Sequence, residues 1–198
     1  MCCRFYVDDD LPEEAAGELG IDFLPGKNWK KGARDIQVTD PSPAVCSNIG
    51  GEKLFFDEMR FGFPNPYHKG VVVNARQESV TEKPMFRESF ETRRCLIPAR
   101  AFYEWDREKQ KVRFTREDGG IIYLAGCFER TEEGLYFVIL TTAPNVCMQG
   151  IHDRMPLMVE RNEARDFILD GQAADELRKK PMPELIPHRP FEQMSFHF

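Results

Sequence analysis

The stretch LYFVILTTA, residues 135–143, opens with six apolar residues that show no alternation with polar ones. A continuous apolar run of this length is typical of a strand that is buried on both faces. The stretch IIYLAGCFE (121–129) is also apolar, and it follows KVRFTRE (111–117) across an Asp-Gly-Gly turn. We therefore predict a β-hairpin formed by 111–117 and 121–129, followed by a buried strand over 135–143.

The chain on either side of this region combines further strands with short helices. Pro near the start and Gly at the end predict a helix over 11–20, and a helical turn is expected near 84–91. Helices over 163–171, closed by Gly171, and over 173–180 are predicted near the C-terminus. Further strands are predicted over 52–60, 71–76, 93–105 and 156–159. We predict a loop with short strands over 24–51 and a loop over 61–70. The fold class is α+β: one domain over 1–198, with a mainly antiparallel, curved, barrel-like sheet and peripheral helices.

Composition excludes several classes of protein. Hydrophobic residues make up 41% and charged residues 30%, as in ordinary globular proteins, and the formal net charge is −6. No run approaches the roughly 18 apolar residues of a membrane span, and MCCRFYVDDD lacks the apolar core of a secretory signal. We expect a cytoplasmic protein without a membrane partner. The acidic total argues against coating of nucleic acid by bulk charge, but it allows a local basic groove.

Cofactor and metal motifs are missing from the sequence. Neither GxGxxG nor GxxxxGK[ST] occurs, so we predict no nucleotide cofactor. Six cysteines are present without a CxxC pair, so we predict no metal site. Because the expected compartment is reducing, we interpret most cysteines as small buried hydrophobic residues and not as disulfides.

Cys2 offers a distinct chemistry. Initiator Met1 is normally removed before a small residue, and Cys2 then carries an α-amine beside its thiol. The reference pKa values are about 7.7–8.0 for the amine and about 8.5 for the thiol, so both are partly nucleophilic near neutrality. The amine can condense with an aldehyde to an imine, and the tethered thiol can close a five-membered thiazolidine ring. A cysteine without a role at a frayed terminus is the alternative.

Four further polar residues interrupt apolar segments. Asn74 follows the apolar residues of VVVNAR, Glu104 lies between the aromatic residues of AFYEW, and His152 and Arg154 lie in GIHDRMP. A carboxyl among aromatic side chains is suited to proton transfer, and a histidine can act as acid or base near neutrality. The residues alone leave open that Glu104 points outward, that His152 bonds to backbone, and that Asn74 caps a turn. They predict at most an N-terminal-nucleophile enzyme.

The order of the motifs resembles the SRAP family, the SOS-response-associated peptidases or abasic-site processing proteins. The resemblance rests on MCCRF (1–5), VNAR (73–76), RCLIPARAFYEW (94–105), AGCFE (125–129) and IHDRMPLMV (151–159). It covers the chain from residue 2 to about residue 159. It implies covalent capture of abasic sites in single-stranded DNA as a thiazolidine crosslink that shields the lesion, with accompanying lyase and autopeptidase-like activities.

The resemblance also implies roles for individual residues. Cys2 would be the nucleophile, and Asn74 would position its amine and the opened sugar. Glu104 would assist ring opening, and His152 would act as acid or base in imine formation and reversal. DNA contacts would come from Arg4, Phe61, Arg76, Thr142 and Arg154, of which Phe61 would stack beside the missing base. The expected partner is abasic single-stranded DNA, bound by a monomer associated with the nucleoid and replication.

The sequence departs from the family pattern at three places. Cys3 follows the terminal cysteine where the family usually has Gly, and this adds a second thiol. The segment DIQVTDPSPAV (35–45) lacks the usual Asn before Ala-Pro, and Phe61-Gly62 replaces Trp-Gly. Two other functions therefore remain: a cysteine peptidase or amidohydrolase using Cys2 and His152, and a binder of single-stranded DNA that does not crosslink.

Overall fold

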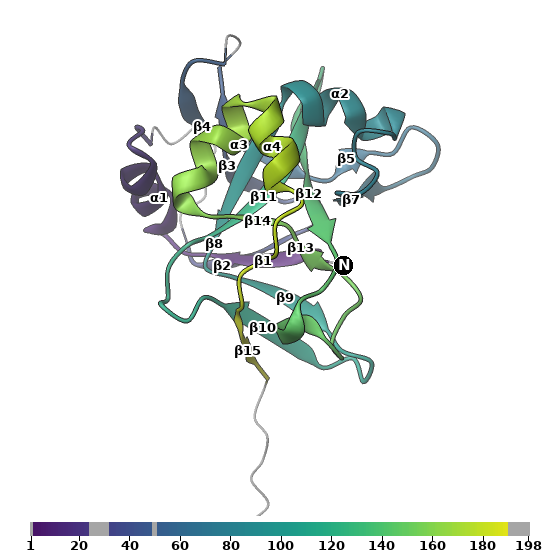
Figure 1. Cartoon of the computed structure of the whole chain (residues 1–198). Coiled ribbons are helices and arrows are strands. Elements are labelled where there is room, and N and C mark those ends of the chain that lie inside the picture. Colours follow the sequence, from purple (N-terminus) through teal and green to yellow (C-terminus); the bar gives the residue numbers. More distant parts are fainter. Residues whose placement is uncertain (1, 24–31, 49–50, 190–198) are drawn as a thin grey trace, which may run out of the picture.

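The computed structural model describes residues 2–23, 32–48 and 51–189, and it has the predicted α+β architecture with a barrel-like sheet (Figure 1). The helices are α1 (Leu11–Leu19), α2 (Pro84–Thr92), α3 (Ala164–Leu169) and α4 (Gly171–Leu177). The strands are β1 (Arg4–Val7), β2 (Arg34–Gln37), β3 (Pro41–Ser47), β4 (Leu54–Phe61), β5 (Phe63–Pro64), β6 (Val71–Val72), β7 (Asn74–Arg76), β8 (Arg94–Ala99), β9 (Ala101–Trp105), β10 (Lys111–Thr115), β11 (Ile122–Thr131), β12 (Gly134–Thr142), β13 (Met155–Pro156), β14 (Met158–Val159) and β15 (Ile186–His188). Single 3₁₀ turns, η1 and η2, cover Val146–Met148 and Arg161–Glu163.

Five of the strands close into a barrel. The strands β12, β4, β3, β8 and β11 are hydrogen-bonded in this order, and β11 pairs with β12 to complete the ring. All of these pairings are antiparallel except that of β12 with β4, which is parallel. A second sheet has the order β15-β10-β9-β1-β2. The chain passes directly from β8 in the barrel to β9 in this sheet, so the two sheets share a corner at Arg100.

The barrel interior is packed by aromatic side chains near β1. Phe5 of β1 makes an edge contact with Phe61 of β4, with ring centroids 5.7 Å apart, and Phe61 stacks on Phe137 of β12 at 5.0 Å. All three rings are fully buried. In Figure 1, β1 lies across the lower end of the barrel. This strand therefore closes one end of the barrel and fixes the position of the N-terminal residues that precede it.

Arg94 ties two helices to the barrel. Its side chain is 6% exposed and donates hydrogen bonds to the carbonyl oxygens of Phe90 and Glu91, near the end of α2. It also donates to the carbonyl oxygens of Phe167 and Ile168 in α3. A guanidinium meets the unpaired carbonyls of helix ends well, because it carries five donors and complements the negative end of the helix dipole.

The structure confirms several predicted elements. The helix predicted over 11–20 is α1, with Gly20 in the left-handed conformation at its end, and the turn near 84–91 is α2. The strand predicted over 135–143 is β12, whose residues from Tyr136 onward are buried. The prediction that 24–51 is mostly loop is wrong for its described residues, most of which form β2 and the seven-residue strand β3; residues 24–31 and 49–50 lie outside the described part.

Two further predictions of local structure are wrong. The hairpin of 111–117 with 121–129 does not form: β10 pairs with β9 and β15, whereas β11 pairs with β8, β12 and β14. The Asp-Gly-Gly turn thus leads from one sheet to the other. The helix over 163–171 ends at Leu169, because the side chain of Asp170 accepts hydrogen bonds from the backbone of Gln172 and Ala173 and begins α4 there.

No helix in the described part of the chain has the length and hydrophobicity needed to cross a bilayer. All six cysteines are free.

Candidate active site

Cys2 lies two residues before the start of β1 and in the interior, with 1% of its surface exposed. The side-chain amide of Asn74 donates to the carbonyl oxygen of Cys2 at 3.0 Å, and also lies 3.4 Å from the carbonyl oxygen of Ile139. Asn74 begins β7, which pairs in parallel with β12 in the register Asn74↔Ile139. The barrel strand thus holds the amide that anchors the N-terminal segment.

The amide oxygen of Asn74 faces the same region. Oδ1 is buried and has no hydrogen-bond partner among the described residues. A buried acceptor of this kind costs free energy unless a ligand or water satisfies it. This atom is therefore a candidate contact for a bound molecule beside Cys2.

Glu104 lies in β9 with 2% of its surface exposed, so the alternative that it points outward is wrong. Burial raises the pKa of its carboxyl, and the charge of His152 acts in the opposite direction. The pKa of the Cys2 thiol is raised well above its usual value, first by burial and then by the charge of Glu104. The charge of Glu104 thus acts on the Cys2 thiol, and the charge of His152 acts on Glu104.

His152 lies in the loop between η1 and β13, and its side chain is 22% exposed. The backbone N–H of Arg154 donates to Nδ1 of His152 at 3.0 Å, and Asp153 Oδ1 is 3.0 Å from the same nitrogen. The predicted alternative that His152 bonds to backbone is therefore correct, and it is compatible with a position beside Glu104. His152 also lines a cavity of about 460 Å³ together with Trp105, Pro144 and Ile151.

The structure thus brings together Cys2, Asn74, Glu104 and His152 from four distant segments. The arrangement combines a thiol, a buried carboxyl, an amide and an imidazole contributed by Cys2, Glu104, Asn74 and His152. Such a set of groups can add a nucleophile to a carbonyl and move the protons that this addition requires. Among the described residues, no group of His, Cys, Asp and Glu is arranged to hold a metal ion.

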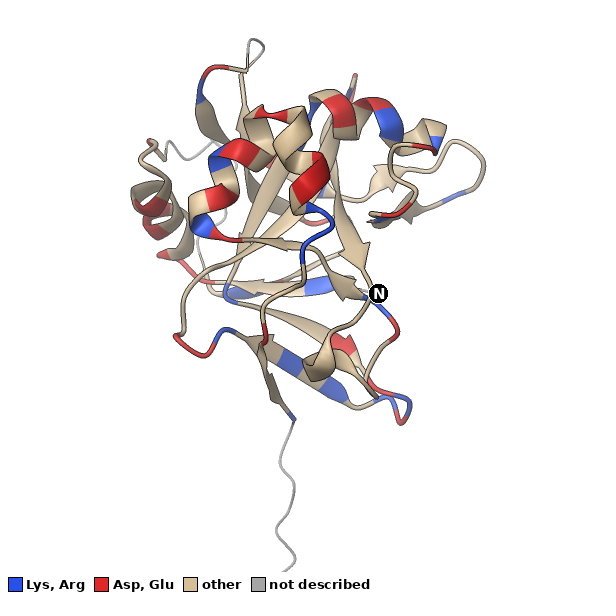
Figure 2. Cartoon of the chain, viewed as in Figure 1, with Lys and Arg blue, Asp and Glu red and all other residues tan. Residues whose placement is uncertain are grey.

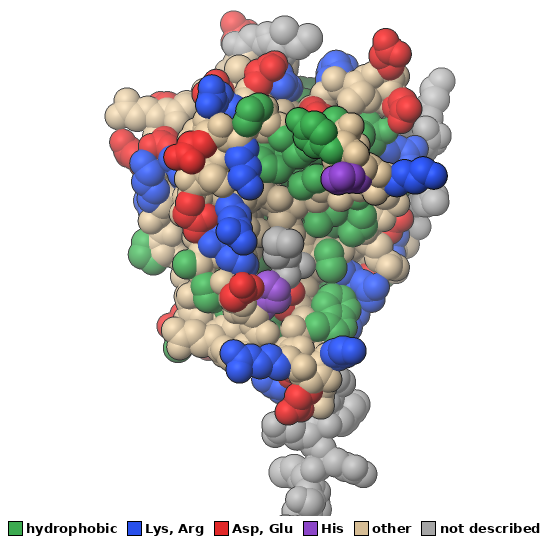
Figure 3. Space-filling view, turned by 90° about the vertical axis from the view of Figure 1, so that its right-hand side faces the viewer, with side chains coloured by type: hydrophobic (Ala, Val, Ile, Leu, Met, Phe, Trp, Pro, Cys, Tyr) green, Lys and Arg blue, Asp and Glu red, His purple; other side chains and the backbone are tan. Residues whose placement is uncertain are grey.

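The predicted DNA-contacting arginines differ in their surroundings. Arg4 donates to Gln37 Oε1 at 3.0 Å, and its guanidinium lies over the ring of Trp105 at 5.3 Å. Arg76 is exposed, whereas the Arg154 side chain is only 14% exposed and pairs with Glu78. On the face of the molecule that Figure 3 shows, Lys and Arg side chains lie beside a central hollow, next to apolar side chains. Figure 2 shows much of the acidic charge on the helices.

The prediction that Phe61 stacks on DNA is wrong. Its ring is fully buried between Phe5 and Phe137 in the barrel, so a base cannot reach it. Thr142 is 9% exposed at the end of β12, and its DNA contact stays a prediction. Sequence reasoning also missed Glu78, the acidic residue that follows NAR in the segment NARQE.

Comparison with known proteins decides the family. The model of the family described as SOS response associated peptidase (SRAP) matches residues 1–197. The chain belongs to the SRAP family. Among curated SRAP relatives, the abasic site processing protein YoaM of Bacillus subtilis is 36% identical over 182 residues, covering 85% of this chain and 79% of YoaM. The abasic site processing protein YedK of Escherichia coli is 31% identical over 166 residues, covering 73% of this chain and 74% of YedK.

A solved structure from Bordetella bronchiseptica supports the SRAP fold. It superimposes with a TM-score of 0.77 at 20% identity, covering 96% of this chain and all of that one. At this identity the similarity concerns the fold. It agrees with the barrel and second sheet described above.

Proposed function

We propose that this SRAP chain captures abasic sites in single-stranded DNA as a covalent crosslink through Cys2, after removal of Met1. The observation that supports this most directly is the position of Cys2, which is buried, held by Asn74 and electrostatically coupled to Glu104. The names of the relatives as abasic site processing proteins point to the same substrate.

The first step uses the α-amine of Cys2. An abasic deoxyribose exists mainly as a closed hemiacetal, and ring opening exposes its aldehyde. The amine attacks the aldehyde carbon, a C–N bond forms, and loss of water gives the imine. Because burial raises the pKa of Glu104, this carboxyl retains its proton nearer neutrality and can protonate the departing oxygen.

The second step closes the ring. The sulfur of Cys2 attacks the imine carbon, a C–S bond forms, and the nitrogen takes up a proton to give a thiazolidine. Burial raises the pKa of the Cys2 thiol, which supports attack by the amine before attack by the thiol. In this proposal His152 accepts the thiol proton as the C–S bond forms. Reversal through the same imine also opens a route to β-elimination, which is lyase chemistry.

The DNA backbone would lie across the face that carries Arg4 and Arg76. Phosphate contacts position a strand without reading its sequence, and a lesion in a single strand needs no duplex opening. Asn74 Oδ1 would accept a hydrogen bond from the opened sugar or the amine. We propose that the protein acts as a monomer on single strands exposed at replication in the nucleoid.

A denaturing gel tests the proposal. Purified protein, whose intact mass shows loss of Met1, is incubated with single-stranded DNA that carries one abasic site. We expect a heat-stable shifted band from the wild type, none from Cys2→Ala, and from Cys2→Ser only an imine that borohydride must trap. Cys3→Ala is the matched control and should crosslink. A stable crosslink from Cys2→Ala, or none from the wild type, would contradict the proposal.

The same experiment separates the alternatives. A peptidase would cleave peptides without DNA, and its nucleophile would have to be the thiol itself, which the raised pKa of Cys2 disfavours. A non-crosslinking binder would retain salt-dependent affinity for single-stranded DNA and give no heat-stable band.

A further inference from the structure

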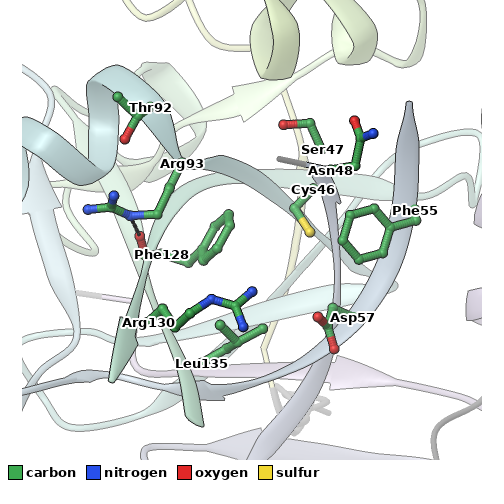
Figure 4. Close-up of a pocket in the computed structure, with 10 residues that line it drawn as sticks. All are labelled: Cys46, Ser47, Asn48, Phe55, Asp57, Thr92, Arg93, Phe128, Arg130 and Leu135. Atoms are coloured by element: carbon green, nitrogen blue, oxygen red, sulfur yellow. Dashed lines mark hydrogen bonds between the residues drawn. The ribbon is translucent and has the colours of Figure 1, made fainter. Parts of the chain in front are cut away.

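The barrel end opposite β1 is open and forms a cavity of about 770 Å³ (Figure 4). Its lining comes from four of the barrel strands and includes Cys46, Phe55, Asp57, Phe128, Arg130 and Leu135. The mouths of β-barrels are common places for small-molecule sites, and this volume lies within the range of such sites, about 300–1,000 Å³.

Strand register explains why these side chains point into the barrel. Phe55 and Asp57 alternate along β4 with the same period as Phe61, which faces the barrel interior. Phe128 is paired with Phe137, and Arg130 with Leu135. The inward faces of the strands thus carry buried aromatic residues at the end of the barrel near β1. At the open end they carry the cation of Arg130, the carboxylate of Asp57 and the rings of Phe55 and Phe128.

The base of the cavity is uncharged. Cys46 is 1% exposed, and burial raises the pKa of its thiol to about 12. In Figure 4, the rings of Phe55 and Phe128 border the cavity from opposite sides. Phe55 is 36% exposed, which is unusual for a phenylalanine in a barrel strand. Two facing aromatic side chains favour a flat, apolar ring system between them.

Two charged side chains of the cavity are available, those of Arg130 and Asp57. Within the described part of the chain, the side chain of Arg130 makes no hydrogen bond or ion pair, and its guanidinium points into the cavity from β11 (Figure 4). Asp57 Oδ1 accepts from the backbone of Glu58 at 2.8 Å, which leaves its other oxygen for a ligand. Arg93 lines the same cavity, but its guanidinium pairs with Glu88 at 2.9 Å and donates to the carbonyl oxygen of Phe128, so Arg130 and Asp57 are the charged groups that remain for a ligand.

We propose that this barrel mouth binds a purine base, of which guanine fits best, as part of a nucleotide. The ring system would lie between Phe55 and Phe128. Arg130 would donate to the O6 and N7 acceptors of guanine, the pairing that guanidinium groups make with this base. Asp57 would accept from the N1 and N2 donors.

The ligand has two possible sources, a free nucleotide or an unpaired base of a bound DNA strand. Leu135, at the cavity, and Ile139, whose carbonyl oxygen contacts Asn74, are four residues apart in β12, which corresponds to roughly 13 Å at about 3.3 Å per residue. A single strand bound at Cys2 can span this distance. The binding site itself does not depend on crosslinking at Cys2.

Titration calorimetry with the full-length protein tests the proposal, with GMP, AMP and inorganic phosphate as separate probes. We expect saturable GMP binding at one site, weaker AMP binding and no comparable phosphate binding. Arg130→Gln should weaken GMP binding at least tenfold, and Asp57→Asn should reduce the preference for GMP over AMP. Arg60→Gln is the matched control, because this exposed arginine lies in β4 with Asp57 but does not line the cavity.

The binding measurements test the proposed site first and then identify the source of the nucleotide. Absence of GMP binding, equal binding of phosphate, or unchanged GMP binding by a folded Arg130→Gln variant would overturn it. A guanine-containing oligonucleotide without an abasic site that displaces GMP identifies DNA as the source, and failure to displace identifies the free nucleotide. Crosslinking by Arg130→Gln at the wild-type rate would keep this site separate from the function proposed for Cys2.

Discussion

Arg154 and Glu78 form a bidentate ion pair: Nη1 of Arg154 lies 2.7 Å from Oε1 of Glu78, and Nη2 lies 2.8 Å from Oε2. Nη2 also donates to the carbonyl oxygen of Thr141 at 2.6 Å. The backbone N–H of Arg154 in turn donates to His152. The guanidinium that we expected on a DNA phosphate is therefore engaged within the protein, and its residue helps to hold the histidine.

Removal of the Glu78 charge should strengthen binding to undamaged single-stranded DNA. Glu78→Gln frees the Arg154 guanidinium and removes a negative charge near the exposed Arg76. If Arg154 then engages one phosphate, the slope of log affinity against log salt steepens by about 0.7. Fluorescence anisotropy in a Cys2→Ser background measures this without crosslinking. Glu82→Gln, at an exposed site nearby, is the control, and an unchanged slope in Glu78→Gln would contradict the prediction.

Glu104→Gln should stabilise the protein at neutral pH. Because burial raises the pKa of Glu104 in the folded state, its contribution to stability is greatest below the unfolded pKa and is lost as the pH rises through the folded pKa. Gln removes the cost of the buried charge. We expect a gain of about 1 kcal/mol, or roughly 2–4 °C in melting temperature, at pH 7. The gain should disappear near pH 4, and a loss of stability at pH 7 would contradict it.

Asn74→Ala should loosen the N-terminal segment. The variant loses the hydrogen bond to the carbonyl oxygen of Cys2, which costs about 1 kcal/mol in the free energy of unfolding. Urea denaturation measures this cost, and a gel time course should show slower crosslinking. Asn74→Asp keeps the size but places a carboxylate against a carbonyl oxygen, so it should be at least as slow. Wild-type rates in both variants would remove Asn74 from the mechanism.

Phe61→Ala should act on stability, because the ring fills the barrel interior between Phe5 and Phe137. Truncation of a buried phenylalanine costs about 3–5 kcal/mol. Tyr67, which is 81% exposed, offers the contrast: Tyr67→Ala should leave the unfolding midpoint within error. Chemical denaturation of the two variants distinguishes them, and a Phe61→Ala variant of wild-type stability would contradict the packing described here.

The local sequence pattern predicted the individual helices and strands better than it predicted which strands pair with one another. The helix over 11–20 and the buried strand over 135–143 follow from residue type and period, which act over short distances. The pairing of β11 with β8 depends on which apolar faces meet in the closed barrel, and no turn residue encodes it. Adjacent strands with a turn between them suggested a hairpin, but the Asp-Gly-Gly turn connects two different sheets instead.

The candidate site likewise has features that local sequence indicates and contacts that it does not. The motifs around Asn74, Glu104 and His152 indicated polar groups in apolar surroundings, and the structure brings them to Cys2. The partner of Arg154 lies 76 positions away, beyond the reach of local pattern. Phe61 was misassigned because an aromatic residue beside a Pro- and Gly-rich loop resembles an exposed wedge, whereas its alternation with Met59 in β4 marks an inward position.

The hydrogen bond between Asn74 and Cys2 joins residues 72 positions apart, and the other two groups come from still later segments. A nascent chain leaving the ribosome therefore presents the cysteine long before the amide, the carboxyl and the imidazole are folded around it. If Cys2 captures abasic sites as we propose, reactivity requires the completed fold, and truncated or misfolded copies would carry the thiol without the groups that assist its attachment to DNA.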